Sequence, residues 1–271
     1  MGRIRKKFES LKTLGKRAFI PFVTAGDPDL DVSKQIVLAL ADNGADIIEL
    51  GVPFSDPMAD GPTIQASSQR ALEKGVALRD VLTMVAELRT ETDVPIILFS
   101  YLNPLFRYGI ERLAADAAAA GVDGVLVTDA VDENAVEIGS VLLKHDLDPI
   151  SLVAPTTTDK RLKRIAERSS GFIYAISRAG VTGARTDTST AAEELVSRVR
   201  QFTELPVAVG FGISTRQQIE DVWRYADAAV VGSAIVAEIG RSIKVGEDPA
   251  ACVQRFVNRL LPSFAKDAAE I

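Results

Sequence analysis

The sequence predicts a (β/α)₈ barrel, the TIM-barrel fold, with an additional helix at each end. Short apolar runs alternate with amphipathic helical stretches along the 271-residue chain. Several runs are continuously apolar, as is typical of parallel strands buried on both faces. There are eight runs, which is the number of strands in such a barrel. They span residues 18–24, 45–51, 94–101, 122–129, 148–154, 171–177, 205–211 and 227–233.

The helices follow from apolar residues at helical spacing, taken in chain order. The first precedes the first strand and presents Ile4, Phe8 and Leu11 on one face. The next, between the first two strands, has Ile36 and Leu40 on its apolar face. Strand and helix then alternate to the eighth strand. A last helix has an apolar face made of Val253, Phe256, Val257, Leu260, Leu261 and Phe264. We expect the terminal helices to pack over the bottom of the barrel and on its outer wall.

No proline-rich or low-complexity linker interrupts this alternation, so we predict that residues 1–271 form one domain. A doubly wound open sheet is the alternative arrangement of alternating strands and helices. The strand count and the total length favour the barrel.

Composition and charge narrow the class of protein. Hydrophobic residues make up 47% of the chain, enough for a large core, and the formal net charge is −6. An acidic chain without a long basic cluster is not expected to bind nucleic acid. No apolar run is long enough for a membrane-spanning helix, and the start lacks the apolar core of a signal peptide. We therefore expect a soluble, cytoplasmic protein.

The chain has one cysteine, Cys252, and one histidine, His145. A single cysteine excludes an internal disulfide, and its apolar helical surroundings are typical of a buried core thiol. The two residues are too few for a zinc site of the usual ligand types. We expect no metal centre.

Glu49 ends the second apolar run. Side chains alternate along a strand, so Ile47, Glu49 and Gly51 share one face, while Ile48 and Leu50 suit the face that packs on helices. Glu49 should therefore point into the mouth of the barrel, where active sites of this fold lie. Apolar neighbours would raise its pKa, which suits a proton shuttle near neutral pH. A structural pair with an arginine at the rim is the alternative.

Glycines follow the last three strands, in loops that should lie at the same end of the barrel. Gly183 follows the sixth strand, Gly212 the seventh, and Gly232 with Ser233 the eighth. Backbone N–H groups exposed beside the starts of short helices bind phosphate. Three such loops favour a phosphate site over ordinary turn chemistry.

The residue types that are missing limit the reaction. No strand end has a lysine for a Schiff base, and no histidine cluster could hold a metal that stabilises an enolate. If the barrel breaks a carbon–carbon bond, the substrate must act as its own electron sink. The enzyme then needs only acids and bases, for which Glu49, Asp60 and Tyr174 suffice.

Six segments in order along the chain resemble the tryptophan synthase alpha chain family, and the second is highly specific. They are IPFVTAGDP (20–28), ELGVPFSDPMADGPTIQ (49–65), YLNPLFRYG (101–109), SRAGVTGAR (177–185), GFGIS (210–214) and GSAIV (232–236). The resemblance implies a lyase that cleaves indole-3-glycerol phosphate to indole and glyceraldehyde 3-phosphate by a retro-aldol step, without a cofactor in this chain.

The resemblance also implies roles for single residues. Glu49 matches the proton shuttle, which protonates C3 of the indole ring and can help take the proton from the substrate's hydroxyl. Asp60 matches the carboxylate that hydrogen-bonds the indole N–H. Tyr174 matches the active-site tyrosine, and Phe22 a wall of the indole pocket.

Further positions match the substrate loops of the family. Arg178 and Thr182 fall in the loop after the sixth strand, which closes over substrate, with Thr182 reaching towards Asp60. Gly183, Gly212, Gly232 and Ser233 match the phosphate site. Asp129 matches a substrate-side aspartate, but the segment TDAVDENA (128–135) departs from the family pattern, because Val131 stands near the usual proline.

The implied partner is a tryptophan synthase beta subunit, in an alpha2beta2 complex, with pyridoxal phosphate in the beta subunit. Asp56 and Pro57 match the interface with that partner. Two alternatives remain from the sequence. One is a stand-alone lyase that releases free indole, and the other is a non-catalytic activator of a beta subunit.

Overall fold

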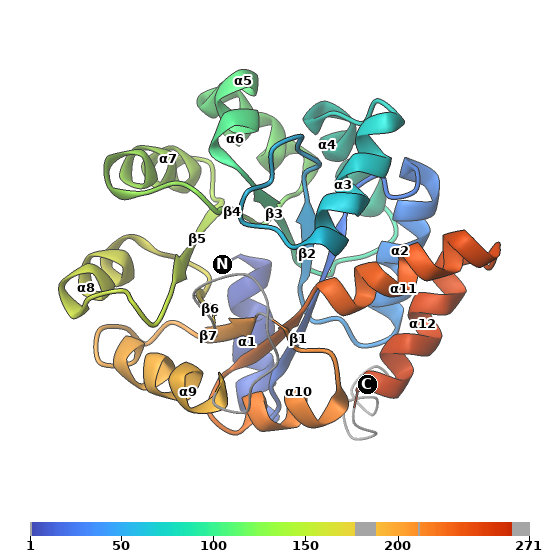
Figure 1. The fold of residues 1–271 in the computed structure, drawn as a ribbon. Coiled ribbons are helices and arrows are strands. Elements are labelled where there is room, and N and C mark those ends of the chain that lie inside the picture. Colours follow the sequence, from blue (N-terminus) through green and yellow to red (C-terminus); the bar gives the residue numbers. More distant parts are fainter. Residues whose placement is uncertain (1, 177–187, 211, 262–271) are drawn as a thin grey trace.

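Eight parallel strands close into a barrel in which each strand pairs with the next and the eighth pairs with the first (Figure 1). The structure is a computed structural model and describes residues 2–176, 188–210 and 212–261. The strands are β1 (Ala18–Thr24), β2 (Ile48–Gly51), β3 (Ile96–Ser100), β4 (Gly124–Val127), β5 (Asp148–Val153), β6 (Ile173–Ile176), β7 (Val207–Gly210) and β8 (Ala228–Val231). The predicted barrel is confirmed, and the closure of the sheet excludes the doubly wound alternative.

Helices surround the barrel, as Figure 1 shows. Those of the first half are α1 (Arg3–Thr13), α2 (Leu30–Asp42), α3 (Pro62–Glu73), α4 (Leu78–Leu88), α5 (Leu102–Tyr108) and α6 (Ile110–Ala120). Those of the second half are α7 (Asp132–Lys144), α8 (Asp159–Arg168), α9 (Thr188–Val199), α10 (Arg216–Trp223), α11 (Ser233–Val245) and α12 (Pro249–Leu260). None of the described helices has the length and apolar character that crossing a membrane requires.

Seven of the eight predicted apolar runs are longer than their strands, whereas the run 18–24 coincides with β1. The run 45–51 contains β2 only from Ile48 onward, and the run 227–233 ends inside α11. Residues 177 and 211, at the ends of two other runs, lie outside the described residues. Ala45 and Ile47, just before β2, are buried although they lie outside the strand, which is why the run begins earlier than the strand.

Two layers of core hold the strands. Inside the barrel, strand residues such as Ile20, Ile97, Leu126 and Ala208 form one cluster. Between strands and helices lies a second, larger cluster, which contains Ile48 and Leu50. Both layers follow from the two buried faces of a parallel sheet.

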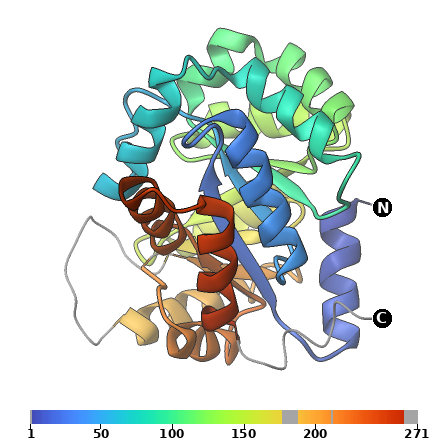
Figure 2. The same cartoon turned by 90° about the vertical axis from the view of Figure 1, so that its right-hand side faces the viewer.

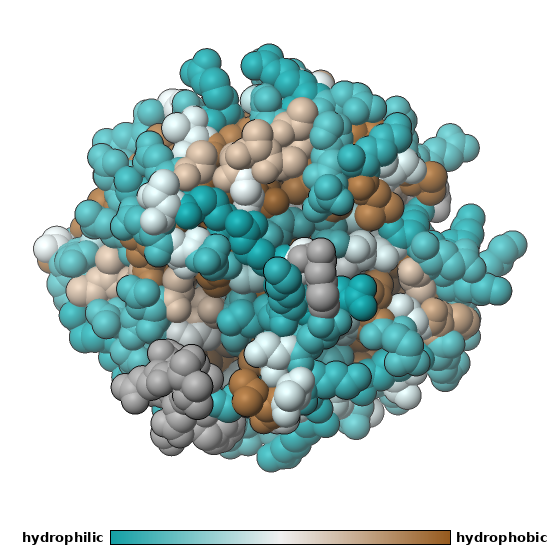
Figure 3. Space-filling model, turned by 180° about the vertical axis from the view of Figure 1, so that it is seen from behind, coloured by the Kyte–Doolittle hydropathy of each residue, from teal (hydrophilic) through white to brown (hydrophobic). Residues whose placement is uncertain are grey.

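Helix α1 lies across the end of the barrel where the strands begin (Figure 2). Its buried residues Ile4, Phe8 and Leu11 join the cluster inside the barrel, and the rings of Phe8 and Phe172 lie 5.8 Å apart. Seen from the end that α1 covers, the surface of the molecule is mostly hydrophilic (Figure 3). The predicted position of the first helix at the bottom of the barrel is confirmed.

Helix α12 packs on α2 and α11, on the outer wall, as expected. Val253, Val257 and Leu260 of its apolar face are buried, and Phe256 is partly buried. The helix ends at Leu260, after which the backbone of Leu261 is extended. Phe264 lies outside the described residues.

Candidate active site

Glu49 lies on β2 and points into the barrel. In the ladder it pairs with Phe22 of β1 and Ile97 of β3, and it has the opposite orientation to Ile48 and Leu50. Its side chain is 1% exposed, and neither carboxylate oxygen has a hydrogen-bond partner among the described residues. Burial raises the pKa of this carboxyl to about 8. This position agrees with the expected proton shuttle. The alternative was a structural pair with an arginine at the rim, and no described arginine pairs with Glu49.

Asp60 lies in the loop between β2 and α3 and is half-buried. The hydroxyl of Tyr101 donates a hydrogen bond of 3.0 Å to its Oδ2 atom. Burial raises the pKa of Asp60 to about 6, against the opposing effect of that hydrogen bond. Because Tyr101 comes from the end of β3, the bond joins two neighbouring loops. Sequence reasoning missed Tyr101, although it begins one of the segments of the resemblance.

Tyr174 points into the barrel from β6 and is 7% exposed. Its pKa lies well above the usual value, because of burial and because of the negative charges of Glu49 and Asp60. The structure therefore brings Tyr174 within electrostatic reach of both predicted catalytic carboxyls. Gly210 on β7 is required here, since a Cβ atom at that position would overlap the Tyr174 hydroxyl.

An apolar wall stands beside Glu49. The rings of Phe22 and Phe99 meet edge to face, with centroids 5.3 Å apart. A Cβ atom at Gly51 would lie 2.5 Å from the Phe22 Cζ atom, so only glycine leaves room for this ring. A flat apolar surface next to an acid suits an aromatic substrate.

The loop glycines lie where α10 and α11 begin. Gly232 is the N-cap of α11, and Ser233 is its first, exposed residue. The first N–H groups of a helix have no intrahelical acceptor, so they are available to an anion. Gly212 adopts a positive φ of 78° with open space around it. The remaining predicted positions of this region, Arg178, Thr182 and Gly183, lie outside the described residues.

The loop that carries Asp60 is supported by α3, which follows it. The hydroxyls of Ser67 on α3 and Thr24 at the end of β1 are 2.6 Å apart and buried. Arg70 donates two hydrogen bonds of 2.7 Å to Asp27, in the loop after β1. These contacts tie the loop to the strand that carries Phe22. No local sequence signal indicated them.

Comparison with known proteins identifies the family of this barrel. The family model for the tryptophan synthase alpha chain matches residues 8–264. The chain belongs to this family. A tryptophan synthase alpha chain from Geobacter sulfurreducens is 48% identical over 251 residues, which cover 90% of this chain and 95% of that protein. Another, from Citrifermentans bemidjiense, is 52% identical over 236 residues, covering 87% and 88% of the two chains.

A solved structure agrees over the whole length. The crystal structure of tryptophan synthase subunit alpha from Legionella pneumophila superimposes with a TM-score of 0.90 at 35% identity, and 99% of each chain is covered. The family resemblance of the sequence is thus confirmed, and membership of the tryptophan synthase alpha chain family makes the chain a lyase of tryptophan biosynthesis.

The residues with predicted partner contacts lie at the rim of the site. Asp56 accepts a hydrogen bond of 2.5 Å from the hydroxyl of Ser55, and the carbonyl of Pro57 accepts one of 3.0 Å from the N–H of Asp60. Between them and Asp60 lies Met58, which is 90% exposed. Whether these residues meet a beta subunit stays a prediction.

Asp129 has a contact that the family resemblance did not indicate. Its Oδ1 atom accepts a hydrogen bond of 2.7 Å from the N–H of Leu102, the first residue of α5. The exposed aspartate therefore joins the ends of β3 and β4, and its predicted contact with substrate stays a prediction. Val131, which the sequence comparison places near the proline of the family pattern, is the N-cap of α7 and is 51% exposed.

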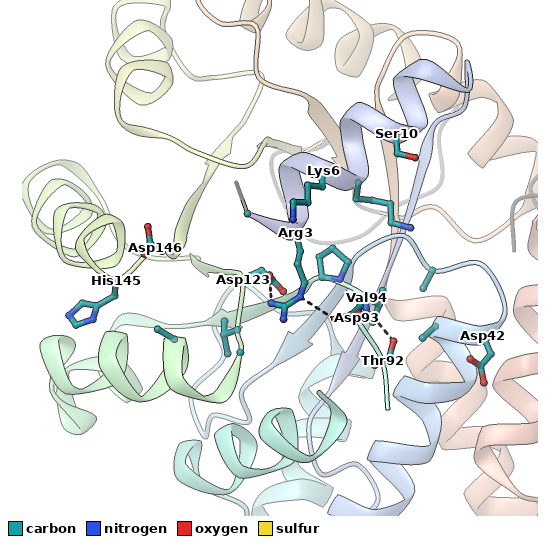
Figure 4. A pocket seen from close by; sticks show the side chains of 18 residues that line it. Arg3, Lys6, Ser10, Asp42, Thr92, Asp93, Val94, Asp123, His145 and Asp146 are labelled. Carbon is teal, nitrogen blue, oxygen red and sulfur yellow. Dashed lines mark hydrogen bonds and ion pairs between the residues drawn. The ribbon is translucent and has the colours of Figure 1, made fainter. Parts of the chain in front are cut away.

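An open groove of about 1100 Å³ lies at the opposite end of the barrel, between α1 and the loops before the strands (Figure 4). None of the predicted site residues lines it. Arg3, which points into it, pairs with Asp123 at 3.1 Å and with Asp93 at 3.6 Å. Among the described residues, no group of three or more His, Cys, Asp or Glu side chains could hold a metal ion.

Proposed function

We propose that this chain cleaves indole-3-glycerol phosphate to indole and glyceraldehyde 3-phosphate, with Glu49 as the proton shuttle. The observation that supports this most is the state of Glu49, a buried carboxyl with no hydrogen-bond partner among the described residues and a pKa of about 8. Such a group is protonated at neutral pH and is ready to give its proton to a substrate beside it. The aromatic wall of Phe22 and Phe99 would hold the indole ring there.

The reaction then needs two proton transfers. Glu49 gives its proton to C3 of the indole ring, which becomes a positively charged indolenine. As the bond from C3 to the side chain breaks, its electrons neutralise the ring nitrogen, and indole is released. The Glu49 carboxylate takes the proton of the neighbouring hydroxyl, whose carbon becomes the aldehyde of glyceraldehyde 3-phosphate. Glu49 ends protonated, so the cycle balances.

Asp60 acts on the charge that develops in this step. A carboxylate hydrogen-bonded to the indole N–H stabilises a positive nitrogen in the transition state. With a pKa of about 6, Asp60 is mostly ionised at neutral pH, in contrast to Glu49. The phenol of Tyr174 stays protonated beside both carboxyls and helps to shape the pocket.

The phosphate end of the substrate would lie on the glycine loops. The start of α11, at Gly232 and Ser233, supplies N–H groups and the positive end of the helix dipole. We propose that Gly212, Gly183, Arg178 and Thr182 complete this end, the last two in a loop that closes over the substrate. Substrate contact by Asp129 belongs to the same proposal.

We further propose a beta subunit as partner, in an alpha2beta2 complex in the cytoplasm. Pyridoxal phosphate would be bound by that subunit, and this chain would use no cofactor. Three exposed apolar side chains support such a surface: Met58, Phe106 and Val131, at 90%, 50% and 51% exposure. Met58 lies in the loop between β2 and α3, Phe106 in α5 and Val131 at the N-cap of α7, and the bonds of Tyr101 and Asp129 join these segments. Asp56 and Pro57 lie beside Met58.

The decisive experiment replaces Glu49→Gln and follows release of glyceraldehyde 3-phosphate. The amide keeps the shape of the side chain but cannot deliver a proton, so turnover should fall by about 10²- to 10⁴-fold. Substrate binding, measured by calorimetry, should remain within a few-fold. The matched control is Glu87→Gln, because Glu87 is exposed and pairs only with Lys34 among the described residues. Wild-type turnover in Glu49→Gln would remove Glu49 from the mechanism.

A further inference from the structure

Tyr101 is a buried residue that the family comparison and the proposed mechanism leave without a role. It is the N-cap of α5, directly after β3, and is 5% exposed. Its hydroxyl donates a 3.0 Å hydrogen bond to Asp60 Oδ2 and accepts one of 3.0 Å from the backbone N–H of Ala59. One phenol therefore contacts both the carboxylate and the backbone of the loop that carries it.

We propose that Tyr101 is a positioning residue that holds the Asp60 carboxylate in the orientation in which its free oxygen meets the indole nitrogen. The inference rests on the proposed function. Among the described residues, only Oδ2 of Asp60 is hydrogen-bonded, so Oδ1 stays available. A carboxylate on an otherwise exposed loop loses rotational freedom when one of its oxygens is fixed, and a group held near its reacting geometry saves entropy during catalysis.

Tyr101 can act in this way because it is itself held from two sides. Its ring packs on that of Phe54, earlier in the same loop as Asp60, with 5.3 Å between centroids. On its other side, the N–H of Leu102 is bound by Asp129 at 2.7 Å. The phenol is thus fixed to the ends of β3 and β4, and the Asp60 loop closes onto it.

The bond also affects the ionisation of Asp60. The titratable groups around it that the structure describes are Tyr101 from β3 and Tyr174 from β6, with Glu49 on β2 and Asp129 after β4 acting on those tyrosines. Burial raises the pKa of Asp60, and the Tyr101 hydrogen bond lowers it, since the O–H donates to the ionised form. Removing the hydroxyl should therefore raise the pKa of Asp60 above about 6.

The test compares wild type, Tyr101→Phe and Tyr108→Phe. Tyr108 is the matched control, because its hydroxyl donates a 2.6 Å hydrogen bond to Asp116, between α5 and α6. Two readouts are taken on the full chain. One is the pH profile of kcat/KM for cleavage, and the other is the ¹³C NMR titration of the Asp60 carboxyl, assigned with Asp60→Asn.

In wild type, kcat/KM should fall on the acid side as Asp60 is protonated and on the basic side as Glu49 loses its proton. Tyr101→Phe should raise the pKa of Asp60 by about one unit, which is tenfold in proton affinity. The acid side of the profile should move by the same amount. The value of kcat at the optimum should fall about tenfold, with KM nearly unchanged. Tyr108→Phe should change neither readout.

An unchanged titration of Asp60 in a folded Tyr101→Phe protein would overturn the proposal, even if its unfolding temperature fell, because Tyr101 would then only support the loop. If Tyr101→Phe does not fold, 3-fluorotyrosine at the three tyrosine positions that remain in Tyr108→Phe provides the second measurement. A more acidic phenol is a stronger donor, so the pKa of Asp60 should fall, and no fall would also overturn the proposal. If the wild-type protein cleaves no substrate, the proposed function is refuted. The NMR titration needs no cleavage, so it would still test whether Tyr101 sets the pKa of Asp60.

Discussion

Two carboxyls of similar intrinsic acidity have different protonation states in this site. Burial without a partner raises the pKa of Glu49 to about 8, whereas Asp60, with the hydroxyl of Tyr101 opposing its burial, reaches only about 6. At neutral pH one is an acid and the other a base. When the surroundings of two carboxyls separate their pKa values, one carboxyl can act as the proton donor and the other can stabilise positive charge.

The burial of Glu49 should be visible in the stability of the fold. The pKa of Glu49 is raised on folding from 4.5 to about 8, so the folded state keeps a proton that the unfolded chain loses. Its contribution is complete below pH 4.5 and is lost as pH rises through about 8, on the order of 5 kcal/mol in all. We expect the free energy of unfolding in urea to fall less with pH in Glu49→Gln than in wild type.

The informative quantity is the difference between the two proteins at pH 5.5, 7 and 8.5, since other buried groups titrate equally in both. Glu87→Gln serves as control and should follow wild type. Parallel curves for wild type and Glu49→Gln would mean that Glu49 is not buried as a neutral acid.

At the scale of elements, three aspartates share one role. Each lies just before a strand and accepts a hydrogen bond from the backbone of the preceding strand. Asp46 accepts from the N–H of Phe19, Asp123 from Ile96, and Asp227 from Val207, each at 2.9 Å. These bonds fix the strand pairs β1–β2, β3–β4 and β7–β8 at the end of the barrel opposite the chemistry. Stability and catalysis are thereby placed at different ends of the same strands.

Asp123 should be the most sensitive member of this group. It also pairs with Arg89 at 2.8 Å and with Arg3 of α1 at 3.1 Å, as Figure 4 shows in part. Asp123→Ala would leave the buried Arg89 and the N–H of Ile96 without this acceptor, at a cost of about 3 to 5 kcal/mol in the free energy of unfolding. Glu9→Ala, which breaks the exposed ion pair with Arg5, should cost less than about 1 kcal/mol. Equal losses of unfolding free energy in the two variants, measured by urea titration, would contradict this structural role of Asp123.

At the scale of the whole molecule, the two ends of the barrel differ. Helix α1 covers the end where the strands begin, as Figure 2 shows, and Asp60 lies in the loop that follows the other end of β2. Met58, Phe106 and Val131 are exposed apolar side chains on segments that follow β2, β3 and β4. A partner on this surface would restrict the Asp60 loop and raise the fraction of molecules with the carboxylate in place.

We therefore expect a beta subunit to raise kcat of cleavage more than it lowers KM, and Met58→Ser to weaken this activation. Leu14→Ser is the matched control, because Leu14 is an exposed apolar residue, 56% exposed, just after α1 at the far end. The measurement is a titration of beta subunit while glyceraldehyde 3-phosphate release is followed. Equal activation of both variants would place the interface elsewhere. Full activity without any partner would favour the stand-alone lyase. If the chain cleaves no substrate at all, the result would favour the non-catalytic activator.

Much of this protein follows from local patterns in the sequence. Eight buried runs predict the barrel, and the alternation of side chains along a strand predicts that Glu49 points inward, because both depend only on residues a few positions apart. The resemblance placed Asp60 and Tyr174 at the same end of the barrel, which agrees with their electrostatic contact.

The contacts that position these residues were decided by the tertiary structure. Tyr101 lies 41 positions from Asp60, Arg70 lies 43 from Asp27, and Asp129 lies 27 from Leu102. Each pair joins different loops, whose side chains meet only because closing the barrel brings the ends of neighbouring strands together. Local periodicity specifies the face on which a side chain lies, whereas its partner across a loop depends on the register and orientation of the assembled strands.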